Sequence, residues 1–174
     1  MKFTKSSTIH TERLCLRAIN DGDVEEVLSI VTDKEVAKTY MLPDFETRED
    51  ALKLFVSLKQ LSSAADRFVY GIDLDGKIIG FINEVEIETD EIEVGFVISP
   101  NHKSNGYATE VLEASMDELF RLGFNKVKTG VFEGNLASMR VMEKSGMVLS
   151  GEEESVEYRG ETHRCICYIK KAGE

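Results

Sequence analysis

The sequence IEVGFVISPNHKSNGYATE, residues 92–110, decides the fold because a strand, a polar loop and a helix start follow one another in it without a break. Residues 91–98 are typical of a β-strand, and the polar loop behind Pro100 leads into an apolar stripe with helical spacing. We therefore predict a strand over 91–98 and a helix over 106–122 that stops at Gly123.

The loop between this strand and this helix has the properties of an anion-binding site. The first turn of a helix presents unpaired N–H groups and a partial positive charge, which suit a pyrophosphate. Gly106 allows close approach of the backbone, Ala108 is too small to block it, and Lys103 adds a positive charge. The alternative is an ordinary connection in which Gly106 only eases a turn, since the sequence has neither the Walker loop spacing nor the dinucleotide fingerprint.

A second informative stretch, GFNKVKTGVFEGNLASMRVMEKSGM at residues 123–147, predicts a strand over 127–132 and a helix over 137–145. The spacing of Asn135 and Ser138 places both on one face of the first helical turn. Taken alone, the simpler interpretation is that Asn135 is an N-cap and that Ser138 faces solvent.

The rest of the chain alternates short strands and helices. A strand is predicted over 13–18, and two helices follow it. A three-strand meander over 68–98 turns first at Asp75-Gly76, a pair that favours the positive φ of a hairpin turn. The chain ends in a predicted hairpin of strands over 155–158 and 163–170. This order predicts the α+β class, with a mixed, mostly antiparallel sheet covered by helices.

Composition bounds the classes of function. The chain fits a single domain over residues 1–174, and its net charge of −11 argues against binding to nucleic acid or to an anionic membrane. The charge favours a cationic partner, the alternative being an acidic surface that serves solubility alone. No stretch approaches the roughly 20 apolar residues of a membrane span, and residues 1–10 lack an apolar signal core, so we expect a cytoplasmic protein. The cysteines and histidines lack metal-ligand spacing, so no metal site is expected.

Both informative stretches together resemble the GNAT superfamily, and within it the RimJ/RimL-like branch. The motifs that carry the resemblance cover nearly the whole chain in the expected order: Thr11-Glu-Arg-Leu-Cys-Leu-Arg17, Asp33-Lys-Glu-Val36, Glu93-Val-Gly-Phe-Val-Ile98, Gly106-Tyr-Ala-Thr-Glu110, and Asn135-Leu-Ala-Ser138 with Glu143-Lys-Ser-Gly-Met147. The resemblance implies a GNAT fold, with a mixed, mostly antiparallel sheet of seven strands flanked by about four helices, and acetyl-CoA as co-substrate.

The resemblance also implies which residues bind acetyl-CoA. They come from the strand that lines the acetyl group, the pyrophosphate loop and the next helix start, namely Phe96, Val97, Ile98, Lys103, Ser104, Asn105, Gly106, Tyr107, Ala108, Thr109, Asn135 and Ser138. The family's loop reads Q/R-x-x-G-x-G/A. Here Lys103 replaces Gln or Arg, and Ser104 replaces the Gly that commonly follows, so phosphate affinity should depend mostly on backbone N–H groups. Met142 replaces the Tyr that many GNAT enzymes use as an acid, which leaves Ser138 to protonate the leaving thiolate.

The implied reaction is direct attack of a neutral amine on the acetyl thioester. Glu93 is the expected general base, through a water, with its pKa raised by the like charge of Glu91, and Glu157 is a second candidate. The alternative for Glu93 is a polar residue on a half-exposed strand. The resemblance implies a bulge in this strand that frees the N–H of Val97 or Ile98 to polarise the carbonyl.

The sequence leaves the acceptor amine open. A protein N-terminus, as in ribosomal-protein modification, is one hypothesis, and a small amine (a polyamine, an antibiotic or an amino acid) is another. The acidic residues within 84–93 suit either cation, or they form only a solvated sheet face. A non-catalytic acetyl-CoA-binding module is a third hypothesis, given the altered loop and the missing Tyr. The acceptor pocket is expected from residues 39–65 and the terminal hairpin, in a monomer or a homodimer.

Overall fold

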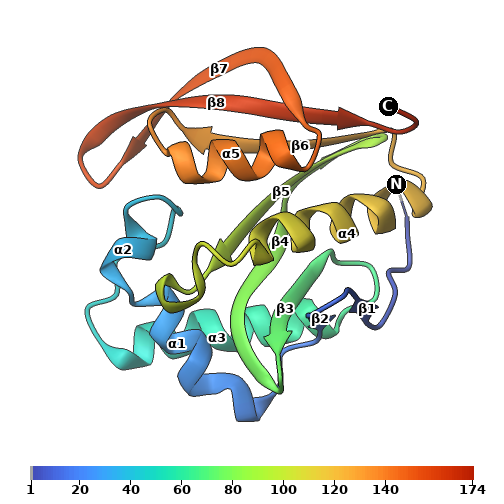
Figure 1. The fold of residues 1–174 in the computed structure, drawn as a ribbon. Helices are drawn as coiled ribbons and strands as arrows, with labels where there is room; N and C mark the ends of the chain where they lie inside the picture. The colour runs from blue at the N-terminus through green and yellow to red at the C-terminus, as the bar shows by residue number, and fades with distance from the viewer. Residues whose placement is uncertain (1) are drawn as a thin grey trace.

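The computed structural model describes residues 2–174, and a single mixed sheet runs through it with the strand order β1-β2-β3-β4-β5-β6-β8-β7 (Figure 1). The strands are β1 (Ile9–His10), β2 (Cys15–Arg17), β3 (Val69–Leu74), β4 (Lys77–Glu88), β5 (Glu91–Ile98), β6 (Lys126–Phe132), β7 (Val148–Tyr158) and β8 (Glu161–Lys171). The helices are α1 (Val24–Val31), α2 (Lys34–Ala37), α3 (Arg48–Ser63), α4 (Tyr107–Arg121) and α5 (Leu136–Lys144), with short 3-10 turns at Asp21–Asp23 and Pro100–His102.

The predicted class is confirmed, because the sheet is antiparallel throughout except for the parallel pair β5 and β6. Within residues 2–174 the sheet has eight strands where seven were expected, and there are five α-helices where about four were expected. The extra elements are β1 and α2, which are too short to produce a periodic sequence pattern. None of the helices in the described chain combines the length and the apolar character that a membrane crossing requires.

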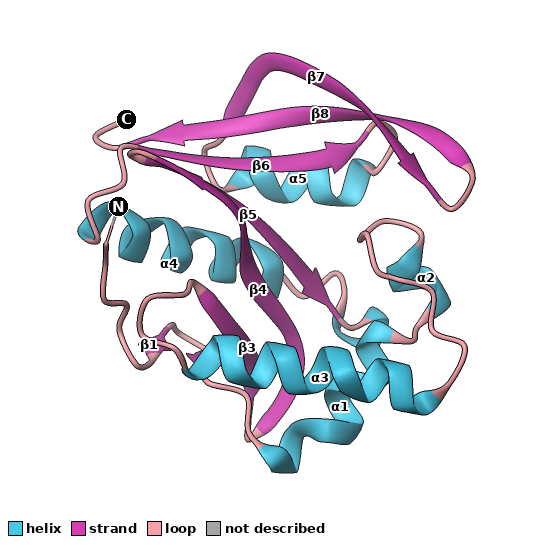
Figure 2. Cartoon of the chain, turned by 180° about the vertical axis from the view of Figure 1, so that it is seen from behind, coloured by secondary structure: helices cyan, strands magenta, loops and turns pink. Residues whose placement is uncertain are grey.

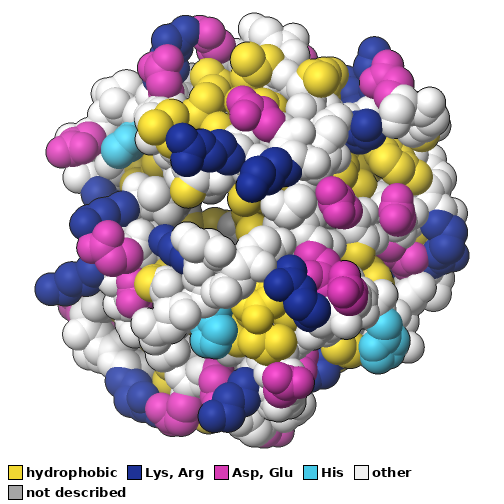
Figure 3. Space-filling model, in the orientation of Figure 1, with side chains coloured by type: hydrophobic (Ala, Val, Ile, Leu, Met, Phe, Trp, Pro, Cys, Tyr) yellow, Lys and Arg dark blue, Asp and Glu magenta, His cyan; other side chains and the backbone are white. Residues whose placement is uncertain are grey.

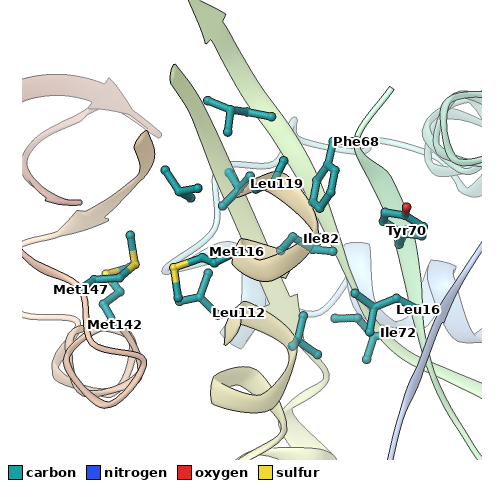
Figure 4. Packing of buried hydrophobic residues seen from close by; sticks show 14 of the residues in the cluster. Leu16, Phe68, Tyr70, Ile72, Ile82, Leu112, Met116, Leu119, Met142 and Met147 are labelled. Atoms are coloured by element: carbon teal, nitrogen blue, oxygen red, sulfur yellow. The ribbon is translucent and has the colours of Figure 1, made fainter. Parts of the chain in front are cut away.

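Helices cover both faces of the sheet, and the alternation of side chains along β5 sorts its residues between two apolar cores (Figures 1 and 2). Val94 and Ile98 pack in the core beneath α4, together with Leu112 and Met116, whereas Val97 packs in the core beneath α1 and α3. Figure 4 shows the first of these cores, in which Leu112, Met116 and Leu119 of α4 lie against Ile82 and Phe68. The strand that carries the candidate site is therefore held from both sides.

The turns that the sequence predicts form as expected, whereas two strands run further than expected. Asp75 and Gly76 have φ values of 52° and 86°, so the β3–β4 hairpin uses two left-handed residues. β4 continues as one strand to Glu88, with a register shift between Glu84 and Glu86 that leaves Val85 59% exposed.

The terminal hairpin also differs from its predicted extent. β7 begins at Val148 instead of residue 155, and β8 begins at Glu161 instead of residue 163. A register shift between Leu149 and Glu153 interrupts the pairing of β7 with β8. This irregularity breaks the period-2 pattern, so the first part of β7 does not look like a strand in the sequence.

Gly80 of β4 provides a stability test of the frame around β5. A Cβ atom at Gly80 would lie 2.1 Å from the carbonyl oxygen of Val97, and a backbone atom cannot move away as a flexible side chain can. We expect Gly80→Ala to lower the free energy of unfolding by about 3 kcal/mol, measured by urea denaturation. Gly134→Ala is the control, because Gly134 has open space around it and a φ of +94°, so only the left-handed conformation is penalised, by about 1 kcal/mol. Equal losses in the two variants would contradict the steric argument.

Candidate active site

The parallel pairing of β5 with β6 ends early, and the two strands then diverge (Figure 2). Their register includes Glu91 with Lys126, Ile92 with Val127 and Glu93 with Lys128, and nothing further. One residue beyond, the Thr129 hydroxyl donates a hydrogen bond of 2.8 Å to the carbonyl of Val94. From that point to its end, β5 has no partner strand on the β6 side within the described chain.

The register with β4 shows which β5 amides face this gap. The N–H of Ser99 donates to the carbonyl of Ile79 at 2.7 Å, and Val97 lies opposite Phe81 in the same unbroken register. Because amides alternate in direction along a strand, the Val97 N–H points to β4, and the N–H groups of Phe96 and Ile98 point into the gap. Of the two N–H groups predicted to polarise the carbonyl, that of Ile98 therefore points into the gap and that of Val97 does not.

The expected bulge lies in a different strand. The register shift is in β4 at Val85, opposite Glu93 and Val94, whereas β5 itself stays regular. The amides are freed because β5 and β6 separate, not because β5 bulges.

The gap opens into a cavity of about 450 Å³ that brings together the predicted site residues Glu93, Phe96, Asn135 and Ser138. Figure 3 shows a hollow in the surface below α5, with Lys and Arg side chains beside it. Met142, which stands where many GNAT enzymes have Tyr, is buried in the wall of the same cavity. The two informative stretches of the sequence thus meet at one site.

The cavity reaches both sides of the sheet. Glu93 and Gly95 lie four and two residues before Val97, so they share its face on the side of α1 and α3. The Tyr40 ring there lies 3.4 Å from a Cβ built on Gly95. Phe96 faces the opposite side and packs against the core beneath α4. A molecule entering beside α5 and another entering beside Tyr40 can therefore meet at the end of the β5–β6 ladder.

Glu93 is half-buried, and its surroundings raise its pKa above the usual value for Glu. Burial is the main cause, and the negative charges of Glu154 and Glu86 add to it, while Lys128 and the backbone amide of Gly130 act in the opposite direction. Gly130 has no side chain to hold the carboxylate away, since a Cβ there would lie 3.3 Å from Glu93 Oε1. The raised pKa suits a group that takes up a proton near neutral pH.

The geometry of the site does not support two predictions about neighbouring carboxylates. Glu91 is not among the charges that raise the pKa of Glu93, and it forms an ion pair with Lys126 instead. Glu157 is exposed and accepts a hydrogen bond from the Thr162 hydroxyl outside the cavity, whereas Glu154 lines it. Alternation along β7 distinguishes Glu154 from Glu157. Val156 also lines the cavity and shares a face of the strand with Glu154.

Asn135 orients Ser138 at the start of α5. The Asn135 side chain caps the helix by accepting a hydrogen bond from the Ser138 N–H at 3.3 Å, as expected for an N-cap. Its amide nitrogen also donates to Ser138 Oγ at 3.0 Å. Because Ser138 Oγ accepts this bond, the hydroxyl proton is available to a group in the cavity.

The start of α4 fits a diphosphate. No side chain within residues 2–174 caps this helix, so its first-turn amides have no side-chain acceptor. Gly106 has a φ of +81°, and Ser104 has a φ of +65°, which explains the Gly that the resembling family commonly has at the position of Ser104. Asn105 donates from its side chain to the carbonyls of His102 and Lys103, and Lys103 is exposed. The loop's own side chains thus leave the anion site open.

Sequence reasoning missed Tyr158, which fixes the wall of the cavity formed by Thr39, Tyr40 and Met41. The Tyr158 hydroxyl donates to the carbonyl of Ala37 at 2.8 Å and accepts from the N–H of Leu42 at 3.2 Å. No sequence signal reveals this contact, because Tyr158 lies on the terminal hairpin, far along the chain from the loop that it holds.

Comparisons with known proteins match the sequence and the fold of this chain. Residues 13–148 match the family model of the acetyltransferase (GNAT) domain. The uncharacterized N-acetyltransferase YoaA of Bacillus subtilis is 30% identical over 88% of this chain and 90% of its own length. An acetyltransferase (GNAT family) from Bacillus anthracis has a crystal structure that superposes with a TM-score of 0.83 at 25% identity, covering 96% of this chain and 99% of that one. RimL, a ribosomal L7/L12 alpha-N-protein acetyltransferase solved with coenzyme A, superposes with a TM-score of 0.82 at 20% identity, covering 94% and 97% of the two chains.

Proposed function

The chain belongs to the GNAT acetyltransferase family and is an acetyl-CoA-dependent N-acetyltransferase, and on that premise we propose that it acetylates the N-terminal amine of a protein. We further propose that residues 1–174 act as one domain of the RimJ/RimL-like branch. The continuity of one sheet from β1 to β8 supports the first part, and the structural similarity to RimL supports the second.

The charge balance of the cavity supports a cationic acceptor. Of its carboxylates, Glu84 pairs with Arg67 and Glu152 pairs with Lys128, which leaves Glu93 and Glu154 without an ion pair within residues 2–174. These two negative charges favour an ammonium group in the cavity, and the character of the rim separates a peptide from a polyamine.

The rim of the cavity has a different character from its interior. Met41 and Val85 line the opening with side chains that are 54% and 59% exposed. Apolar side chains beside an acidic interior suit a peptide, which presents an amine next to its own side chains.

The residues divide the reaction among them. Acetyl-CoA supplies the activated acetyl thioester. The first-turn amides of α4 bind its diphosphate, and the N–H groups of Phe96 and Ile98 stabilise negative charge on the acetyl oxygen. Glu93 takes one proton of the acceptor ammonium, directly or through a water. Ser138, oriented by Asn135, donates a proton to the departing sulfur and regains one from the second N–H proton that the nitrogen loses after its attack.

Glu93→Gln tests the base. The amide keeps the shape of the carboxyl group but takes up no proton, so kcat should fall by about 100-fold while the Kd for coenzyme A stays the same. Steady-state kinetics and calorimetry measure the two quantities. Glu91→Gln is the matched control on the same strand, and it should keep the turnover of the wild type.

The pH profile of the same reaction extends this prediction. A base acts only above its pKa, so kcat/KM should rise with pH through the raised pKa of Glu93. Glu154→Gln removes a negative charge that raises this pKa, so the acidic limb should move to lower pH with the same amine. If the acidic limb stays at the same pH, the charge of Glu154 does not affect the group that titrates there, which would contradict Glu93 as the base.

Ser138→Ala tests the acid. Loss of the hydroxyl should lower kcat by about 10- to 100-fold and change the Kd for coenzyme A by much less than that, because the proton is needed only as the thiolate departs. Ser29→Ala, at an exposed position on α1, is the matched control. Full turnover in Ser138→Ala would reject the assignment.

An acceptor panel tests the proposed function. We expect peptides with a free N-terminal amine to be acetylated with a kcat/KM at least roughly tenfold above that for spermidine, an amino acid or an aminoglycoside, since only the peptide also contacts the apolar rim. Thiol release measures the rate, and mass spectrometry locates the acetyl group. Peptides already blocked at the N-terminus are the control. Preference for a small amine would overturn the proposal.

A further inference from the structure

A guanidinium group from the N-terminal segment lies against the loop that precedes α4. Arg13 Nη1 donates to the carbonyl of Asn105 at 2.9 Å, and the guanidinium stacks on the Tyr107 ring with 4.6 Å between its carbon and the ring centroid. Arg13 Nη2 would lie 3.4 Å from a Cβ built on Gly106. Arg13 therefore contacts Asn105 and Tyr107 and lies beside Gly106 between them, all within the predicted diphosphate site.

The same guanidinium neutralises a carboxylate that is badly placed for binding an anion. Glu110 is in the first turn of α4, and Arg13 holds it through Nε at 2.8 Å and Nη2 at 2.7 Å. The Arg13 backbone N–H and the Thr11 hydroxyl donate to its other oxygen. Burial acts to raise the pKa of Glu110, but these hydrogen bonds outweigh it and lower the pKa, so the group is charged at neutral pH.

An unpaired carboxylate at this position would repel the phosphates that the helix start attracts. The only cation of the loop sequence is Lys103, which is exposed. The contact has little value for stability by itself, because the Arg13 side chain is 43% exposed and such surface ion pairs contribute little. The contact instead neutralises the charge of Glu110 and fixes the direction of the Asn105 carbonyl.

We propose that Arg13 is a positioning residue of the diphosphate site, which cancels the charge of Glu110 and holds the Asn105 carbonyl away from the bound phosphates. The sequence gives no sign of this role, since Arg13 and Glu110 are 97 residues apart and meet only in the fold.

Binding measurements on the full chain test the proposal without any acceptor. Arg13→Met keeps the length of the side chain but removes its charge and donors, and it should weaken coenzyme A binding by roughly tenfold in calorimetry. Binding of pantetheine, which lacks the diphosphate and is titrated at millimolar concentration, should not change. Arg48→Met is the matched control, because Arg48 at the start of α3 pairs with Glu25 of α1 and both side chains are exposed.

A second substitution separates this role from a merely structural one. In Arg13→Met the Glu110 charge is left unpaired, so adding Glu110→Gln should recover at least about threefold of the lost affinity for coenzyme A. An equal loss for coenzyme A and pantetheine, an unchanged affinity in Arg13→Met, or no recovery in the double variant would each overturn the proposal. Thermal unfolding of every variant shows that the comparison is made on folded protein.

Discussion

The site depends on the point at which β5 and β6 stop pairing. Buried backbone amides almost always have hydrogen-bond partners, so a strand that leaves its neighbour inside a sheet creates a demand for another acceptor. Here the ladder ends at Glu93, and the Thr129 hydroxyl satisfies the carbonyl of Val94. The Phe96 amide beyond it is aimed at a cavity that an acetyl carbonyl can enter, and the Ile98 amide points to the same side of β5. The same divergence places the Glu93 carboxylate beside Gly130, so one break in the sheet sets both the donors and the base.

The sequence predicts those parts of the molecule that depend on local rules. Asp75-Gly76 turns where two positive φ values are needed, and Gly106 starts α4 in a left-handed conformation. The amphipathic stripes find the strands and the long helices, because burial on one face leaves a periodic trace. These rules suffice for the α+β class, and the resemblance adds that Asn135 and Ser138 approach Glu93, which spacing alone does not reveal.

The remaining features are non-local, and the chain gives no periodic sign of them. The register shift in β4 leaves no sign in the alternation of the sequence around it, yet it leaves Val85 exposed at the rim. The raised pKa of Glu93 comes first from burial, which depends on what packs around it, and not from its sequence neighbour Glu91. Tyr158 likewise acts on a loop that is distant in sequence and adjacent only after folding. Such contacts are set by tertiary packing and not by propensity.

The net charge of −11 suggests a cationic partner. This number is a sum over the whole chain, however, and the two sides of the sheet bind substrates of opposite charge. On one side, Arg13 balances Glu110, so the dipole of α4 is not cancelled where a diphosphate would bind. On the other side, Glu93 and Glu154 line the cavity that an ammonium group would enter, and neither forms an ion pair within residues 2–174. β5 separates the two environments by alternation alone, since Glu93 and Gly95 face one side and Phe96 faces the other. A two-substrate reaction between an anionic donor and a cationic acceptor needs this separation, because in a single mixed pocket each charge would be neutralised by protein groups instead of by its substrate.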